Sequence, residues 1–319
     1  MQVLVVGAGA VGQVYGRYLA LAGAEVTFFV KEKYAEDCRR GFTMYPLNKK
    51  GVSPERFDGF GVMTTVAEVA GTAWDAVFLT VSSTALRDGT WLADIGKATG
   101  DATIAFLQPN IDDRDFLTSV IDARRVVDGM IGFIAYQAPL PGETRFPQPG
   151  MAYFFPFGSP SAFSGPPARR DPIIETLRRA NFPAAARRDI YATARFPNAM
   201  LYAYLAALEG AGWSFAKLRT GNFLELAAQG AAQAMVVTGQ QIGRKPPLLM
   251  RLAARAFVIR MALRLAPFLI PIPLEIYLKY HFTKVGGQTR LGMRSFIELG
   301  KRAGLDVSAI ERLTNLLRA

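Results

Sequence analysis

The first part of this chain takes its fold from residues 3–12, Val3-Leu4-Val5-Val6-Gly7-Ala8-Gly9-Ala10-Val11-Gly12. Its four branched apolar residues, 3–6, predict a buried strand, and three glycines spaced as G-x-G-x-x-G follow directly. Apolar residues then recur at helical spacing over 11–22, and a second apolar run covers 25–30. This order of strand, glycine turn, helix and strand is typical of a Rossmann-type dinucleotide-binding unit.

Each glycine of this turn has its own expected role. The first permits a tight turn, the second lets the backbone approach a pyrophosphate, and the third allows the helix to pack closely on the strand. The N-terminus of that helix then faces the phosphates. We therefore expect a cofactor to be bound by the whole turn, Gly7, Ala8, Gly9, Ala10, Val11 and Gly12. The alternative is that the glycines serve only a tight turn.

The residue that closes the second strand indicates which dinucleotide is bound. A carboxylate there would bind the ribose hydroxyls of NAD, whereas a cation favours the 2′-phosphate of NADP. Lys31 comes first after the apolar run, and Arg39 and Arg40 lie nearby, so the sequence favours NADP. The alternative is that Lys31 is an ordinary surface cation.

The remaining pattern predicts an α/β protein, with a doubly wound sheet followed by an all-α domain. Further strands are expected at 76–81, 103–107 and 125–134, alternating with helices at 66–70, 83–98 and 113–121. Proline and glycine clusters over 138–172 suggest turns and short antiparallel strands at the far edge of the sheet, before a last helix at 172–181. We expect domains at 1–188 and 189–319, the second with helices at 198–208, 223–242, 248–265, 274–282, 292–303 and 308–317.

Composition narrows the class of protein further. The formal net charge of +11 would suit nucleic acid, an anionic membrane or a phosphorylated dinucleotide, but the cations are dispersed and no nucleic-acid-binding module is found. The only cysteine, Cys38, excludes an intrachain disulfide and favours a reducing compartment, so we expect a cytoplasmic protein. With His281 as the only histidine, we expect no metal site.

The opening glycine turn, a basic residue after the second strand and a helical second domain together resemble the ketopantoate reductase family. The resemblance implies NADPH-dependent reduction of a small carbonyl substrate, a 2-oxo acid. Lys31 matches the family's basic residue for the 2′-phosphate, and Ser82 falls where the family often has a lysine. Residues 107–110 resemble the family's segment at the nicotinamide, so Gln108 and Asn110 join the expected cofactor-binding residues.

The second domain departs from the family pattern at two positions. Asn198 matches a catalytic asparagine, which places Ala194 where the family has a lysine, and Gln288 aligns with a late acidic residue. Reducing a ketone needs a proton donor at the carbonyl oxygen, and Ala194 has none to give. Tyr202, one helical turn from Asn198, is the more credible donor, so we expect Asn198 and Tyr202 to be catalytic. The alternative for Tyr202 is a core aromatic.

These departures favour a substrate other than ketopantoate, and they leave open an inactive NADP(H)-binding sensor or interaction protein.

One further segment, 246–282, is apolar and basic, with Arg251, Arg255, Arg260 and Arg264 in its first half. At 100° per residue the first two of these arginines lie nearly opposite the last two, which draws a poor amphipathic face. The sequence therefore favours core packing and a homodimer contact over a hydrophobic lid, and least of all membrane attachment.

Overall fold

The computed structural model describes residues 1–49 and 51–317, and the chain divides into two compact units. The first unit holds Met1–Gln108 and Asp113–Tyr191, and the second holds Pro109–Asp112 and the chain from Ala192 onward. The expected division lay between residues 188 and 189. The short segment Pro109–Asp112 is grouped with the helical unit although it directly follows a strand region of the first unit.

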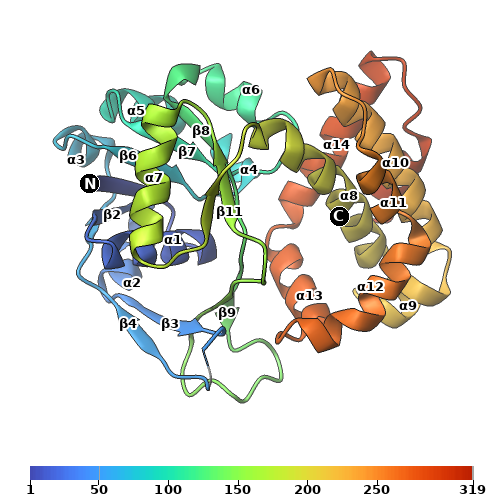
Figure 1. The fold of residues 1–319 in the computed structure, drawn as a ribbon, viewed down its shortest axis with the longest axis horizontal. Helices are drawn as coiled ribbons and strands as arrows, with labels where there is room; N and C mark the ends of the chain where they lie inside the picture. The colour runs from blue at the N-terminus through green and yellow to red at the C-terminus, as the bar shows by residue number, and fades with distance from the viewer. Residues whose placement is uncertain (50, 318–319) are drawn as a thin grey trace. The chain divides into compact units, whose positions relative to one another are not determined.

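The first unit is built on an eight-stranded sheet in the order β12-β11-β8-β7-β6-β1-β2-β5 (Figure 1). The strands are β1 (Gln2–Val6), β2 (Glu25–Phe29), β5 (Gly61–Met63), β6 (Ala76–Leu79), β7 (Thr103–Phe106), β8 (Val126–Met130), β11 (Ser161–Ser164) and β12 (Ala184–Ala186). Neighbours pair in parallel except β8 and β11. The chain leaves β1 toward β2 and returns on its other side at β6, so the switch point lies between β1 and β6.

Both faces of this sheet are covered, as the doubly wound class requires. Side chains alternate along β1: Val3 and Val5 join one apolar core, while Leu4 and Val6 join another. The first core is completed by α1 (Ala10–Leu21) and α7 (Pro167–Arg179), and the second by α3 (Val66–Ala70), α5 (Trp91–Ala98) and α6 (Asp113–Thr118). The predicted α/β class with a helical second part is confirmed.

A second sheet was not expected from the sequence. It has the order β4-β3-β10-β9, with β3 (Phe42–Pro46), β4 (Glu55–Phe57), β9 (Ile134–Ala138) and β10 (Gly150–Phe154). The predicted single strand 125–134 is therefore wrong, because the chain leaves β8 and enters β9 in the other sheet. At the crossing, a Cβ on Gly132 would lie 2.4 Å from the backbone of Pro160. Of the strands expected over 138–172, β10 lies in this second sheet and only β11 extends the first.

The predicted helix over 83–98 is also two helices. The chain forms α4 (Ser83–Leu86), turns through Gly89 at φ +81°, and begins α5 at Trp91. A left-handed backbone of this kind ends a helix and favours glycine. The other short helices of this unit are α2 (Ala35–Arg39) and the 3-10 turns η1 (Glu32–Tyr34) and η2 (Ala123–Arg125).

The second unit is helical and has its own core. Its helices are α8 (Ile190–Gly210), α9 (Phe215–Thr220), α10 (Phe223–Ile242), α11 (Leu248–Ala253), α12 (Ala256–Leu269), α13 (Leu274–Lys284), α14 (Gly286–Arg302) and α15 (Ser308–Thr314). Small residues let these helices approach closely, and Gly230 on α10 faces Leu313 of α15 and Ala203 of α8. The expected helix 248–265 is wrong in one respect, because it is broken between Ala253 and Ala256.

Candidate functional site

The glycine turn connects β1 to α1 at the switch point of the main sheet, and its three glycines have different surroundings. Gly7 adopts φ +98°, which L side chains rarely adopt. A Cβ on Gly12 would lie 2.1 Å from the Gly7 carbonyl oxygen, so only glycine permits this approach of helix to strand. At Gly9 nothing lies within 4 Å of the added atom. The exposed side of the turn is therefore at Gly9, where a pyrophosphate is expected to approach.

The start of α1 is suited to bind an anion. Gly9 is its N-cap and offers no side chain, so the N–H groups of the first turn are left without helical acceptors. No carboxylate lies in this first turn to occupy them. On the buried side, Gln13 donates to the Ala8 carbonyl oxygen at 2.8 Å, which fixes the turn. Ala8, Ala10 and Val11 are half-buried around the open position. The residues present thus fit the phosphates of a dinucleotide.

Thr80 follows β6 and is not among the residues predicted from the sequence. Its hydroxyl lies within hydrogen-bond distance of two carbonyl oxygens, that of Val6 at 2.8 Å and that of Gly7 at 2.9 Å. It therefore joins the ends of β1 and β6 beneath the glycine turn. The same hydroxyl would lie 2.7 Å from a Cβ on Gly12. A polar residue directly after the apolar run 76–79 was the only sequence feature that pointed to it.

Lys31 lies directly after Val30, at the end of β2, and begins the turn η1. Its ammonium group is 3.0 Å from a carboxylate oxygen of Asp88, and its side chain is 67% exposed. An exposed pair of this kind contributes little to stability, so the lysine can exchange Asp88 for another anion. Of the two arginines expected nearby, Arg40 pairs with Glu36 and Asp37 within its own turn.

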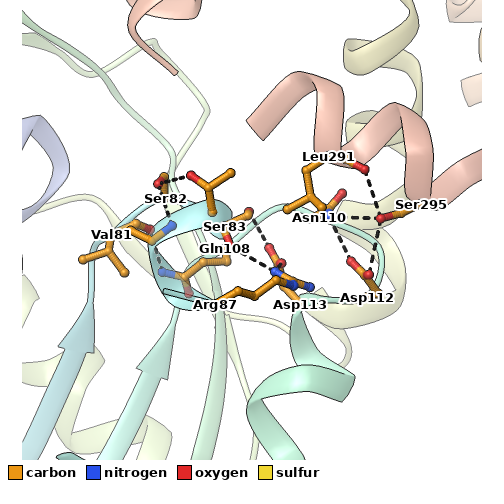
Figure 2. Close-up of polar contacts among 12 residues, drawn as sticks. Val81, Ser82, Ser83, Arg87, Gln108, Asn110, Asp112, Asp113, Leu291 and Ser295 are labelled. Carbon is orange, nitrogen blue, oxygen red and sulfur yellow. Dashed lines mark hydrogen bonds and ion pairs between the residues drawn. The ribbon is translucent and has the colours of Figure 1, made fainter. Parts of the chain in front are cut away.

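The structure gives Ser82 and Gln108 local tasks. Ser82 caps α4, accepting a hydrogen bond from the Ala85 N–H at 3.2 Å. The Gln108 amide donates to the carbonyl oxygens of Leu79 and Val81, both at 2.9 Å, so its two N–H bonds tie the end of β7 to β6 (Figure 2). A role for Gln108 toward the cofactor would have to use something other than these donors.

A buried carboxylate joins α4 to α6 in the same unit. Asp113 is fully buried, accepts a hydrogen bond from the Ser83 hydroxyl at 2.6 Å, and pairs with the Arg87 guanidinium (Figure 2). Arg87 also donates to the Ser83 carbonyl oxygen at 3.0 Å. Burying a charge is tolerated only with such partners. This cluster fixes the loop after β6, and no spacing of residues in the sequence predicts it.

In the helical unit, several candidate residues meet at the segment Pro109–Asp112. The Asn198 amide donates to the Pro109 carbonyl oxygen at 3.1 Å, so α8 holds this segment. The Asn110 amide donates to Asp112 at 2.8 Å and lies 3.5 Å from the Ser295 hydroxyl of α14 (Figure 2). Ser295 in turn lies 3.3 Å from the other Asp112 oxygen. The predicted residues Asn110 and Asn198 are thus brought to one place.

Tyr202 belongs to the same place. A Cβ on Gly292 of α14 would lie 2.8 Å from Cζ of Tyr202 and 2.9 Å from Oδ1 of Asn110, so the missing side chain lets both approach. The Tyr202 ring packs edge-on against Phe296, with 6.1 Å between ring centres, and is buried. Arg195 is buried as well, whereas Ala194 is half-buried and has no polar group. Gly292 and Ser295 were not anticipated.

Two kinds of site are not found. Among residues 1–49 and 51–317, no group of three or more histidine, cysteine, aspartate or glutamate side chains is arranged to hold a metal ion. Within the same ranges no helix is both long and apolar enough to cross a bilayer.

The eight-stranded sheet with its glycine turn, together with a helical second unit, defines a doubly wound α/β protein of the Rossmann type. Residues 3–157 match the family described as Ketopantoate reductase PanE/ApbA. Over those residues the chain is similar to this family, as its resemblance had implied, and throughout it has the fold of solved ketopantoate reductases. No curated protein matches the chain.

Solved structures with this fold include two kinds of enzyme. A PanE/ApbA family ketopantoate reductase from Ralstonia eutropha is 19% identical with a TM-score of 0.74, covering 100% of this chain and 97% of its own. A 2-dehydropantoate 2-reductase from Geobacter metallireducens is 15% identical with a TM-score of 0.71, covering 99% of each chain. D-mandelate dehydrogenase, solved with NADH, is 15% identical with a TM-score of 0.69, covering 99% of this chain and 97% of its own.

Proposed function

We propose that this chain is an NADP-dependent reductase of a 2-oxo acid or a related ketone, with a substrate other than ketopantoate. The observation that carries the proposal is the glycine turn at the switch point of the eight-stranded sheet, within the residues that match the ketopantoate reductase family. A Cβ would meet open space at Gly9 and the backbone of Gly7 at Gly12. NADPH supplies a hydride when it is bound. The chain's own residues then have to hold the carbonyl compound and provide a proton at its oxygen.

Asn198 and Tyr202 are the residues we assign to the substrate side. Asn198 acts by positioning, because its amide holds the Pro109 carbonyl and thereby the segment that carries Asn110. Tyr202 provides the donor that Ala194 lacks, and its phenol can hydrogen-bond a carbonyl oxygen as charge develops there. The changed positions 194 and 288 support a substrate other than ketopantoate. D-mandelate dehydrogenase, a neighbour in fold, has been solved with anilino(oxo)acetate, a compound larger than ketopantoate.

The direct test of the reaction is oxidation of NADPH by the purified protein with a panel of 2-oxo acids and ketones, ketopantoate included. Turnover is expected with at least one bulky 2-oxo acid and is expected to be poor with ketopantoate. No turnover across the panel, with NADPH still bound, would contradict a reductase. Efficient turnover of ketopantoate would contradict the assignment of a different substrate.

Tyr202→Phe tests the proton donor. We expect kcat to fall by about 10²-fold or more, because a general acid contributes roughly 10²–10⁴, while NADPH binding stays the same. Tyr204→Phe is the matched control, since Tyr204 lies on the same helix and donates to the Ala254 carbonyl oxygen at 2.7 Å. It is expected to lower stability and leave kcat unchanged. Unchanged turnover in Tyr202→Phe would make this tyrosine a core residue only.

Lys31→Ala tests the cofactor preference. The wild-type protein is expected to bind NADPH more tightly than NADH, and the variant to lose about tenfold in NADPH affinity with little change for NADH. Asp88→Asn is the control, because it frees Lys31 from its ion pair and is expected to preserve or strengthen NADPH binding. Titration of both cofactors by fluorescence measures the ratio. Equal affinities in the wild-type protein would overturn the assignment of NADP.

We also propose that the enzyme is cytoplasmic, because its single cysteine cannot form an intrachain disulfide and suits a reducing compartment.

Cys38, the only cysteine, is buried, and this burial raises the pKa of its thiol to about 11. The thiol is therefore protonated at neutral pH and plays no part in the proposed chemistry.

A further inference from the structure

The outer face of α12 carries large apolar side chains that the rest of the chain leaves exposed. Phe257, Phe268 and Leu269 are 68%, 85% and 73% exposed, and Val258, Met261 and Leu265 lie between them on the same face. These positions, spaced by one, three, four, three and one, form a single helical stripe. The opposite face, with Ile259 and Leu263, packs against the core of the helical unit. Both faces of α12 are thus apolar, and only one is covered.

Helix α11 precedes α12 in the chain and lies beside it (Figure 1). Leu248, Leu249 and Leu252 are all exposed. Beside them, a groove of about 500 Å³ lies between α10 and α11. Its lining is apolar except for Lys245, Arg251 and Arg255. We call the exposed residues of α11 and α12 together with these three cations the α11–α12 surface. Monomeric soluble proteins rarely expose a contiguous apolar surface of this kind without a use for it.

The charge on this surface has one sign. No aspartate or glutamate occurs between Glu225 and Glu275, whereas this interval holds six cations. Arg260 is turned to Glu225, at 2.8 Å. Lys245, Arg251, Arg255 and Arg264 are exposed and form no ion pair with the described part of the chain. The surface therefore combines apolar side chains with uncompensated positive charge.

Because the chain breaks between α11 and α12, the arginines of this segment do not have to lie on opposite sides of one helix. Over one continuous helix the arginines would lie on opposite sides, but the chain forms two helices, and Arg260 points to Glu225. A second copy of this chain is a poor partner, because a symmetric contact would set the same cations against one another with no acidic residue to pair with them. A bilayer with anionic headgroups complements both features.

We propose that the α11–α12 surface attaches the protein peripherally to an anionic phospholipid bilayer. The helices lie in the plane of the interface, with the stripe among the acyl chains and the exposed cations at the phosphate level. This proposal rests on the helical unit alone and is independent of the proposed reductase activity. It replaces the homodimer contact that the sequence favoured for this segment.

Vesicle flotation of the full chain tests the proposal. The protein is expected to float with phosphatidylcholine vesicles that contain phosphatidylglycerol, and only weakly with phosphatidylcholine alone. The double variant Phe257→Ser/Phe268→Ser is expected to lose about tenfold or more in partitioning. Arg251→Gln/Arg264→Gln should lose roughly fivefold per cation on anionic vesicles, and added salt should weaken wild-type binding.

Two control variants change similar residues elsewhere in the chain. Phe157→Ser removes a fully exposed phenylalanine of the first unit, and Lys97→Gln removes an exposed cation there. Both are expected to float like the wild type, and all variants should keep the wild-type Tm and NADPH affinity. No flotation with anionic vesicles would overturn the proposal. The proposal would also be overturned if the wild-type protein formed a concentration-dependent dimer without binding vesicles, and Phe257→Ser/Phe268→Ser dissociated that dimer.

Discussion

Gly9 and Gly12 lie three residues apart, but a methyl group meets open space at the first and a carbonyl oxygen at the second. Gly9→Ala is therefore expected to fold with an unchanged Tm, since its backbone at φ −77° suits alanine. The new methyl group would occupy the side from which a pyrophosphate approaches, so NADPH affinity should fall about tenfold or more. Isothermal titration measures the affinity.

Gly12→Ala is the matched variant in the same turn. Its Cβ cannot be accommodated without moving α1 away from β1, because the clashing atom belongs to the Gly7 backbone. We expect a loss of about 1–3 kcal/mol in unfolding free energy and a Tm several degrees lower. If Gly9→Ala also destabilised the fold, or bound NADPH normally, the assignment of separate roles to the two glycines would fail.

At the scale of elements, a single buried arginine joins the end of α5 to the start of β8. Arg125 is 8% exposed and donates to the carbonyl oxygens of Gly96 at 2.8 Å and Ala102 at 3.0 Å, and to the Thr99 hydroxyl at 3.0 Å. A cation at a helix C-terminus satisfies carbonyls that the helix leaves without donors. Burial lowers the pKa of Arg125 from its usual value, but the guanidinium stays charged at neutral pH.

Arg125→Met is expected to destabilise the fold by about 3 kcal/mol, because several buried acceptors lose their donors at once. Arg124→Met is the control one residue away, because Arg124 is exposed and pairs with Asp122, which lies two residues before it. Its Tm should match that of the wild type. If thermal denaturation showed the same change in Tm for both substitutions, the buried hydrogen bonds of Arg125 would not contribute to stability as proposed.

For the molecule as a whole, we expect the only histidine, His281, to make stability depend on pH. Burial lowers the pKa of His281, and Lys284 lowers it further, while its ring stacks on Tyr277 with 5.5 Å between ring centres. The unfolded chain then binds a proton more readily than the folded chain. The contribution of neutral His281 to the free energy of unfolding is fully present above the unfolded pKa of about 6.5. This contribution is lost as the pH falls through that value toward the lower pKa of the folded chain.

His281→Phe keeps a ring against Tyr277 and cannot be protonated. Thermal denaturation from about pH 7.5 to about pH 5.5 is expected to show a falling Tm in the wild type and a flatter profile in the variant. Every other titratable group is common to the two proteins, so its contribution cancels when the two profiles are compared. Identical profiles for the two proteins would contradict this assignment.

Elements whose pattern is local could be predicted from the sequence. The glycine turn, and the helices Val66–Ala70 and Phe223–Ile242, occur at the predicted residues because hydrophobic periodicity and glycine placement act within a few turns of chain. The similarity of residues 3–157 to the ketopantoate reductase family was implied by the same local features. The position of Lys31 after β2 was also predictable, since a strand's end is marked by the end of its apolar run.

Contacts between residues far apart in the sequence could be seen only in the folded chain. The hydrogen bonds of Thr80 to Val6 and Gly7, and the support of Asp113 by Ser83 and Arg87, depend on strand order and loop packing that no spacing encodes. The second sheet pairs residues about a hundred positions apart. Which side of an apolar helix is covered depends likewise on its neighbours. The sequence of α12 shows apolar residues all round, and only packing leaves Phe257 and Phe268 in contact with water.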